Sequence, residues 1–220
     1  MHGACASAVC GYELYVLNNK GEIQPPGVLG NLVIKLPLPP GTLPTLYNHT
    51  DKFIETYLEP NPGYYTTGDA GFIDEDGYIH IMARSDDVIN TAGHRLSTGA
   101  IEEVLLDHPD VADCAVIGVH DDLKGEVAVG FVTLNKGAQT EDEALCKDLV
   151  QRVRDSIGPV AAFKKVRVVK ALPKTRSGKI LRNTMRKIAN GEPYSITPTI
   201  EDPCIFEYLA PEIRSLVASK

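Results

Sequence analysis

Short apolar runs separated by turn residues fill the first 83 residues, a pattern typical of small β structure. Glycine, proline or asparagine ends each run, and these residues stop a strand because they favour turn conformations. The segment Asp74-Glu75-Asp76-Gly77 divides two of the runs and predicts a tight hairpin. We expect strands over residues 12–17 and 31–36, a short helix over 47–58 and a hairpin over 71–81.

After residue 86 the apolar positions alternate between helical and strand spacing. A helix is expected to begin at Thr98 as its capping residue, with Glu102 and Glu103 placed to complement the helix dipole. A second helix opens with a capping box formed by Thr140 and Glu143. Its apolar stripe comprises Leu145, Leu149, Val153 and Ile157, and Gly158-Pro159 ends it. The other expected elements are strands over 111–119, 126–134 and 165–172, and helices over 180–189 and through Ile205, Leu209, Ile213 and Leu216.

The change of pattern predicts two regions of different architecture. The fold class is α+β: a small β-rich subdomain, followed by an α+β domain whose short, antiparallel-containing sheet is flanked by helices. The expected divisions are residues 1–84, 85–191 and a C-terminal tail over 192–220, which ends in a helix. A β-rich piece of that size buries little apolar surface and would be marginally stable alone.

The composition is that of an ordinary globular protein, with 43% hydrophobic and 23% charged residues among 220. No apolar run approaches the roughly 18 residues of a membrane-spanning helix. The five cysteines are odd in number and include no C-x-x-C pair, which argues against a disulfide framework and a zinc site. The net charge of −7 is uneven, because residues 151–190 hold twelve of the 22 basic residues and one acid. That segment is expected to attract anions.

Three side chains after the first β segments suit a nucleotide. Asp69 follows a Thr67-Gly68 turn, where its carboxylate can accept two hydrogen bonds from a vicinal diol such as a ribose. Arg84 and Arg95 carry planar forks of donors that match phosphate oxygens. An Asx turn for the aspartate and a solvated surface position for each arginine are the alternatives that the residues alone leave open.

A polar loop near the C-terminus carries the sharpest candidate for catalysis. Lys179 ends the segment Lys174-Thr175-Arg176-Ser177-Gly178-Lys179, which we interpret as flexible, so that the charge can reach a site formed elsewhere. The segment is not a Walker loop, because Pro173 stands where that motif requires glycine. A lysine on a solvated basic loop is the alternative. Gly93, which lacks a side chain, allows close approach of a ligand, although a plain turn glycine explains it as well.

Several segments in order along the chain resemble the later signature segments of the adenylate-forming enzymes, in the variant of the short-chain acyl-CoA synthetases. They are Tyr65-Thr66-Thr67-Gly68-Asp69, Ala83-Arg84-Ser85-Asp86-Asp87-Val88-Ile89-Asn90, Gly93-His94-Arg95-Leu96 and Leu172-Pro173-Lys174-Thr175-Arg176-Ser177-Gly178-Lys179-Ile180. The likeness is strongest to the mitochondrial, propionate-type members and covers nearly the whole chain. It corresponds to the last third of such an enzyme.

The resemblance implies a role for each candidate at the nucleotide. Asp69 would hold the ribose hydroxyls of ATP, Arg84 would lie near the ribose and α-phosphate, and Arg95 would lie further along the phosphates. Lys179 would bridge the carboxylate substrate and the α-phosphate during adenylation. Asp86 would be the hinge between the large and the small domain.

The resemblance also implies a coenzyme A site. The strip at Gly93 would meet the pantetheine arm, although Ala92 stands where the acetyl enzymes generally carry serine. Arg154 lies in a segment similar to the one whose arginine contacts coenzyme A. Backbone oxygens of Leu106, His108 and Val111 match positions that hold a structural cation, and no side-chain cluster of metal-ligand type is evident.

The activity implied is that of an AMP-forming acid–thiol ligase, which uses ATP with Mg²⁺ and coenzyme A to activate a short-chain carboxylate, propionate or else acetate. Its partner would be the large N-terminal domain, without which the chain is expected to be inactive. The location implied is the mitochondrial matrix, with the cytoplasm as the alternative. Two other classes stay open: a non-catalytic interaction domain, and a nucleic-acid-binding module on 151–190, a segment that has only Phe163 for base stacking.

Overall fold

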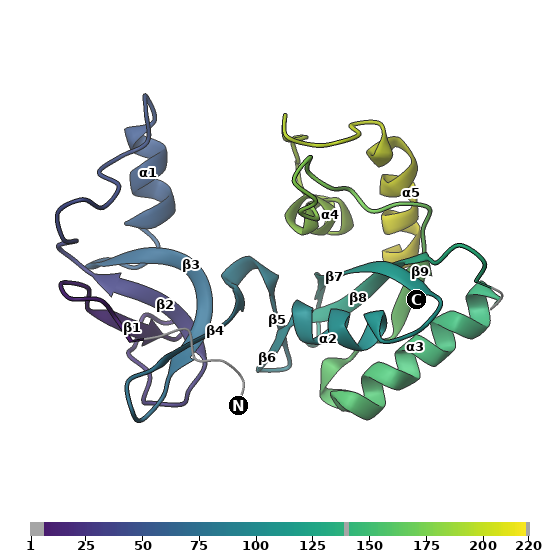
Figure 1. The fold of residues 1–220 in the computed structure, drawn as a ribbon, viewed down its shortest axis with the longest axis horizontal. Coiled ribbons are helices and arrows are strands. Elements are labelled where there is room, and N and C mark those ends of the chain that lie inside the picture. The colour runs from purple at the N-terminus through teal and green to yellow at the C-terminus, as the bar shows by residue number, and fades with distance from the viewer. Residues whose placement is uncertain (1–6, 139–140, 219–220) are drawn as a thin grey trace. The chain divides into compact units, whose positions relative to one another are not determined.

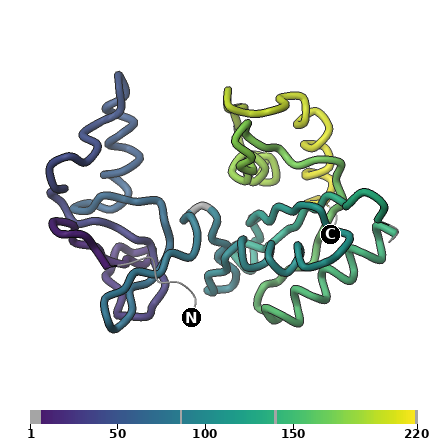
Figure 2. Tube along the Cα trace, in the orientation of Figure 1, coloured from purple at the N-terminus to yellow at the C-terminus, as the bar shows by residue number. Residues whose placement is uncertain are grey.

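The computed structural model of the protein describes residues 7–138 and 141–218, with the side chain of Asp86 left out. The chain forms two compact units, Met1–Asp86 and Asp87–Lys220, and each is described by itself. The first unit runs from purple to blue and the second from teal to yellow along the trace (Figure 1, Figure 2). In these described residues, no helix combines the length and the apolar character that a membrane crossing requires.

The first unit is a four-stranded antiparallel sheet with strand order β1-β2-β3-β4. One helix, α1, packs on β3 through aromatic side chains, with the rings of Tyr57 and Tyr65 stacked at 5.2 Å and Phe53 buried beside them. The elements are β1 (Leu14–Leu17), β2 (Gly30–Lys35), α1 (Thr50–Tyr57), β3 (Tyr64–Ile73) and β4 (Ile79–Arg84). The strands, the short helix and the hairpin expected from the sequence are therefore confirmed.

The second unit is built on a five-stranded sheet with the path β6-β5-β8-β7, and β9 pairs in parallel with β8. The connecting turn η1 (Ser85–Asp87) precedes it. Its strands are β5 (Val88–Thr91), β6 (His94–Ser97), β7 (Val111–Asp121), β8 (Gly125–Leu134) and β9 (Lys165–Val168). Its helices are α2 (Thr98–Leu106), α3 (Asp142–Ser156), η2 (Pro159–Ala161), α4 (Arg182–Ala189) and α5 (Ile205–Ala218).

Helices cover both faces of this sheet because its strands are apolar on both sides. Along β7, Cys114 and Val116 pack with α2 and α3, whereas Ala115 and Ile117 pack with α4 and α5. The long helix α3 buries the stripe expected from its 3.6-residue spacing, with Leu145, Leu149 and Val153 all fully buried. The predicted α+β class, with a short sheet flanked by helices, is confirmed.

Two capping details differ from the sequence-based expectation. The N-cap position of α2 is Ser97, which makes no side-chain cap hydrogen bond, and Thr98 is the first helical residue, with a buried side chain. For α3 the capping position is Glu141, which makes no side-chain cap hydrogen bond, and Thr140 lies outside the described residues.

The strand expected over residues 165–172 is shorter in the structure. It is β9, which ends at Val168, because the backbone N–H of Lys170 donates to the hydroxyl of Tyr208.

The C-terminal segment belongs to the core of the second unit. Leu209 and Ile213 of α5 are fully buried, in one cluster with Met185 and Ile188 of α4. The expected helix is confirmed, and its apolar stripe packs on the face of the sheet opposite α3. The segment from 192 onward is thus a structural layer of this unit.

Candidate functional site

Asp69 and Arg84 lie directly opposite each other on the paired strands β3 and β4. The expected turn before Asp69 is wrong, because Thr67 and Gly68 lie within β3, at a bulge in its pairing with β2. The hydroxyl of Thr67 holds this bulge, since it donates to the carbonyl of Leu32 at 2.7 Å and accepts from the backbone N–H of Asp69 at 3.1 Å. Asp69 is half-buried and Arg84 is exposed. The structure thus brings together, on one rigid hairpin, a carboxylate and a guanidinium that suit a ribose and a phosphate.

This arrangement favours glycine at position 68. Its φ of +78° lies in the left-handed region, and a Cβ there would stand 3.1 Å from Nη2 of Arg84. We expect Gly68→Ala to lower the free energy of unfolding of the first unit by about 1–2 kcal/mol from backbone strain alone, and further through the contact with Arg84. The measurement is urea denaturation followed by tyrosine fluorescence, since the chain has no tryptophan.

Gly63→Ala is the matched control for that prediction. Gly63 has a φ of +86°, and its Cβ would meet no atom within 4 Å. It therefore carries the backbone strain without the steric contact. Equal losses of stability for the two variants would contradict the role of Gly68 in admitting Arg84.

Gly93 lies at the tip of the hairpin formed by β5 and β6. Ala92 and Gly93 both have positive φ, 48° and 85°, which is the geometry of a two-residue hairpin turn. The turn is braced, because the N–H of Ala92 donates to the carbonyl of Lys124 at 2.7 Å. A Cβ on Gly93 would meet nothing within 4 Å, so this side of the turn faces open space. The strip can therefore be approached closely by an elongated ligand.

Arg95 follows on β6, opposite Asn90 of β5. Its side chain is half-buried, and this burial lowers the pKa of the guanidinium from its ordinary value, although a group of such basicity keeps its charge at neutral pH. Arg95 and Gly93 thus share one hairpin in the second unit. Asp69 and Arg84 belong to the first unit.

Lys179 lies in a turn whose backbone is hydrogen-bonded along its length. Thr175 accepts from Gly178 and donates its own N–H to the carbonyl of Lys179, each at 2.8 Å, while the N–H of Arg176 donates to Thr199. Bridges at Lys174 and Thr175 tie the same segment to its neighbours. The segment expected to be a flexible loop is thus a turn whose backbone makes local and long-range hydrogen bonds, and its flexibility stays a prediction. The side chain of Lys179 is exposed.

The turn continues into α4, and the first residue of that helix, Arg182, makes a partly buried ion pair with Glu102. Two hydrogen bonds join them, from Nε to Oε1 at 2.8 Å and from Nη2 to Oε2 at 2.7 Å. Oε1 also accepts the N–H of Val116, on the edge strand β7. Burial by itself would lower the pKa of the Arg182 guanidinium. The hydrogen bonds and the negative charge of Glu102 act in the opposite direction, and as a result this pKa is raised.

Sequence reasoning missed this pair. The expectation that Glu102 complements the helix dipole is wrong, because the first turn of α2 holds no acidic residue. Glu102 is 8% exposed, on the inward face of α2 with Ile101 and Leu105. An acidic residue flanked by inward apolar positions at helical spacing is the signal that could have indicated it. The partner could not have been found, since Arg182 lies 80 residues further along the chain.

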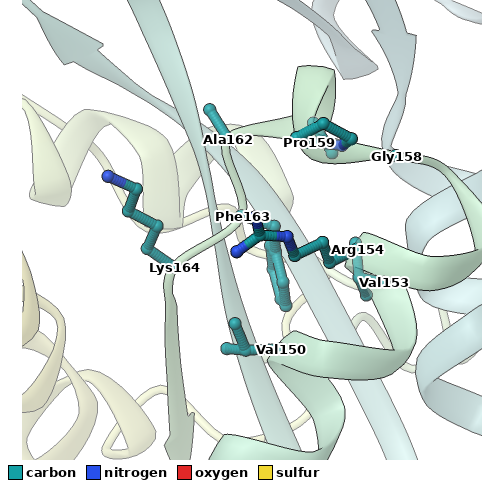
Figure 3. A pocket seen from close by; sticks show the side chains of 9 residues that line it. Val150, Val153, Arg154, Gly158, Pro159, Ala162, Phe163 and Lys164 are labelled. Atoms are coloured by element: carbon teal, nitrogen blue, oxygen red, sulfur yellow. The ribbon is translucent and has the colours of Figure 1, made fainter.

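Arg154 lies at the C-terminal end of α3 and lines a pocket of about 300 Å³. Its neighbour Asp155 accepts a hydrogen bond from Gln151, on a different side of the helix. Among the residues that the structure describes, none pairs with the guanidinium of Arg154. Figure 3 shows this side chain extending from α3 toward the segment that carries Phe163 and Lys164. It is thus available to an anionic ligand.

The carbonyl groups of Leu106, His108 and Val111 come from the end of α2 and the start of β7. The carbonyl of His108 accepts from the N–H of Val111 at 3.0 Å, and that of Val111 accepts from the amide of Asn135 at 3.2 Å. Across residues 7–138 and 141–218, no three His, Cys, Asp or Glu side chains are grouped as metal ligands would be. The backbone cation site stays a prediction.

Comparisons with known proteins indicate which class of protein these features resemble. Residues 100–179 match the AMP-binding enzyme C-terminal domain. The chain is 48% identical over 215 residues to acyl-CoA synthetase short-chain family member 3, mitochondrial, of Mus musculus, an alignment that covers 98% of this chain and 32% of that protein. The chain thus spans about a third of the length of this curated relative.

Solved structures agree with the fold. Acetoacetyl-CoA synthetase from Streptomyces lividans aligns over 96% of this chain and 32% of its own with a TM-score of 0.80, at 23% identity. ATP-bound MatB from Rhodopseudomonas palustris aligns over 84% of this chain and 35% of its own with a TM-score of 0.66, at 28% identity. The resemblance to the adenylate-forming enzymes, and within them to short-chain acyl-CoA synthetases, is confirmed.

Proposed function

We propose that the chain is the C-terminal part of an AMP-forming acyl-CoA synthetase. The observation that carries the proposal is the hairpin on which Asp69 faces Arg84 across paired strands, next to Gly68, whose positive φ favours glycine. A carboxylate and a guanidinium held at this spacing suit the ribose and the α-phosphate of one nucleotide. The relatives' names and the ATP-bound structural neighbour support ATP as that nucleotide.

The reaction runs in two steps. A carboxylate oxygen attacks the α-phosphorus of ATP, pyrophosphate leaves, and an acyl-adenylate forms. The thiol of coenzyme A then attacks the acyl carbon and AMP leaves. Lys179 neutralises charge on the α-phosphate in the first step, and Arg95 contacts the phosphates. The Mg²⁺ that accompanies ATP is carried on its phosphates in this proposal, and no carboxylate of the chain is assigned to it.

We further propose that successive parts of the chain have separate roles. Residues 1–84 end the large N-terminal domain, residues 85–191 are the mobile small domain with 192–220 as its C-terminal extension, and Asp86 is the hinge. Rotation at the hinge would place Lys179 in the active site for the first step and the Gly93 strip there for the second step. The rest of the N-terminal domain is the partner on which catalysis depends, so the 220-residue chain by itself is expected to be inactive.

The acyl substrate is a short-chain carboxylate in this proposal, propionate before acetate, and the location is the mitochondrial matrix. The short chain of the substrate and the mitochondrial location are supported by the name of the mouse relative, and the order of propionate before acetate rests on the resemblance of the sequence segments. A nucleic-acid-binding module fits less well, because much of the basic charge in 151–190 is engaged within the protein. Ion pairs join Arg152 to Asp148, Arg167 to Glu212, Lys174 to Asp113 and Arg182 to Glu102.

Isothermal titration of coenzyme A, ATP and AMP into the chain tests the proposed ligands. We expect coenzyme A to bind and Arg154→Ala to weaken it by about tenfold or more, because a hydrogen bond to a charged group contributes about 1.5–3 kcal/mol. Arg152→Ala is the matched control, since Arg152 lies on the same helix and is paired with Asp148 at 2.6 Å. Coenzyme A binding that both variants reduce equally, or that neither reduces, would contradict the role of Arg154.

A further inference from the structure

Lys164 stands at the junction of two neighbouring pockets. The Arg154 pocket is lined by Val150 and Lys164, and both also line a second pocket of about 340 Å³ between α3 and β9. Lys164 is exposed and follows directly after Phe163, which is 5% exposed. It is thus the cation common to both cavities.

The backbone just before Lys164 explains why its side chain points outward. Ala162 has a positive φ of 49°, which turns the chain, and the ring of Phe163 then packs against Gly130, where a Cβ would lie 2.7 Å from the ring. Because Phe163 is held inward, the next residue faces the pocket mouth. Figure 3 shows Lys164 on the side of Phe163 away from the helix that carries Arg154.

The other basic residues beside these pockets are engaged within the protein. The ammonium of Lys147 lies 2.7 Å from Glu143, and that of Lys165 donates to the carbonyls of Leu216 and Val217 at the end of α5. Lys164 has no such partner in the part of the chain that the structure describes. Arg154 and Lys164 are therefore the two cations of the pocket that a ligand can recruit.

Between the two cations the pocket floor is apolar. Val153, Ala161 and Phe163 are buried there, and Val150 is half-buried. An apolar floor with a cation on either side fits a ligand that has an apolar face and phosphate groups at separate positions. A nucleotide with phosphate on two positions of its ribose has this chemistry, whereas a nucleotide phosphorylated at one position offers one anionic group.

We propose that Lys164 is a second phosphate-binding residue of the Arg154 pocket, and that the two cations together select coenzyme A over forms that lack its 3′-phosphate. This inference rests on the proposed coenzyme A site at Arg154 and adds the residue that determines its specificity. Arg154, with its planar fork of donors, contributes to the binding of coenzyme A whether or not the 3′-phosphate is present. Lys164, as a mobile point charge, contributes where the extra phosphate is present.

Calorimetric titration of the 220-residue chain with coenzyme A, dephospho-coenzyme A, AMP and inorganic phosphate tests the proposal. We expect Lys164→Gln to weaken coenzyme A binding about fivefold, the effect of one exposed ion pair of about 1 kcal/mol, and to leave dephospho-coenzyme A binding unchanged. Lys164→Arg keeps the charge and should retain the discrimination. Lys147→Gln is the matched control, because that lysine lines the adjacent pocket but is paired with Glu143.

The outcomes separate this inference from the proposed function. Binding of coenzyme A that is lost in Arg154→Ala but unchanged in Lys164→Gln overturns the role of Lys164 alone. Equal binding of coenzyme A and its dephospho form to the unaltered chain also overturns it, as does equal weakening by Lys164→Gln and Lys147→Gln. No binding of coenzyme A to the unaltered chain overturns the Arg154 site and this inference with it. Equally strong binding of inorganic phosphate would indicate a general anion site and would contradict the selectivity.

Discussion

Replacement of Lys179 by alanine is expected to slow acyl-adenylate formation by about a hundred- to a thousandfold, the usual effect of removing one preorganised electrostatic contact. The turn that carries Lys179 is hydrogen-bonded through Thr175, and the side chain is exposed, so truncation removes a charge without disturbing the fold. The second step, thioester formation from preformed acyl-adenylate, should change little because the lysine acts on the α-phosphate.

The measurement needs the domain on which the activity depends. A chimera in which this chain replaces the matching 32% of the mouse relative supplies it. Pyrophosphate release reports the first step, and conversion of added acyl-adenylate reports the second. Arg176→Ala is the matched control, because it removes an exposed cation from the same turn. A similar loss in both variants, or an equal loss in both steps for Lys179→Ala, would contradict the assigned role.

Replacement of Glu102 by alanine is expected to lower the free energy of unfolding of the second unit by about 3 kcal/mol, the lower end of the range for breaking a buried ion pair. The lower end applies because the side chain of Arg182 is 22% exposed and the charge of Asp87 remains near it. Three hydrogen bonds are lost at once, two from Arg182 and one from the N–H of Val116. Since domains are stable by only about 5–15 kcal/mol, this single change removes a large share of the stability. It also releases the start of α4, next to the turn that holds Lys179.

Cys114 provides a probe of the second unit alone. Burial raises the pKa of its thiol to about 12, so the reactive thiolate is scarce at pH 8 until the unit unfolds. In a variant that keeps Cys114 as its one cysteine, urea-dependent alkylation should report the loss in Glu102→Ala. Glu103→Ala is the matched control, because Glu103 is exposed on the same helix. The double change Glu102→Met with Arg182→Leu should recover much of the stability, and its failure to do so would contradict the cost assigned to the unpaired charge.

Much of the fold could be predicted because the signals were local. The apolar stripe of α3, through Leu145, Leu149 and Val153, is set by helical spacing within one segment. The hairpin over residues 71–81 follows from the turn chemistry of Asp74 to Gly77. The candidates Asp69, Arg84 and Lys179 came from segments that resemble one family, and the structure places Asp69 in β3, Arg84 at the end of β4 and Lys179 beside a hydrogen-bonded turn. Their assigned roles remain proposals.

What the sequence alone determined is therefore the elements, the fold class and the resemblance to short-chain acyl-CoA synthetases, all of which are encoded in patterns within short segments. What only the tertiary structure decided is how distant residues meet. The Glu102–Arg182 pair joins positions 80 residues apart, and the hydrogen bond from Arg176 to Thr199 ties the Lys179 loop to a segment further along the chain. The outward position of Lys164 depends on the packing of Phe163 against Gly130. Such contacts have no local signal, because they depend on which surfaces the folded chain brings together.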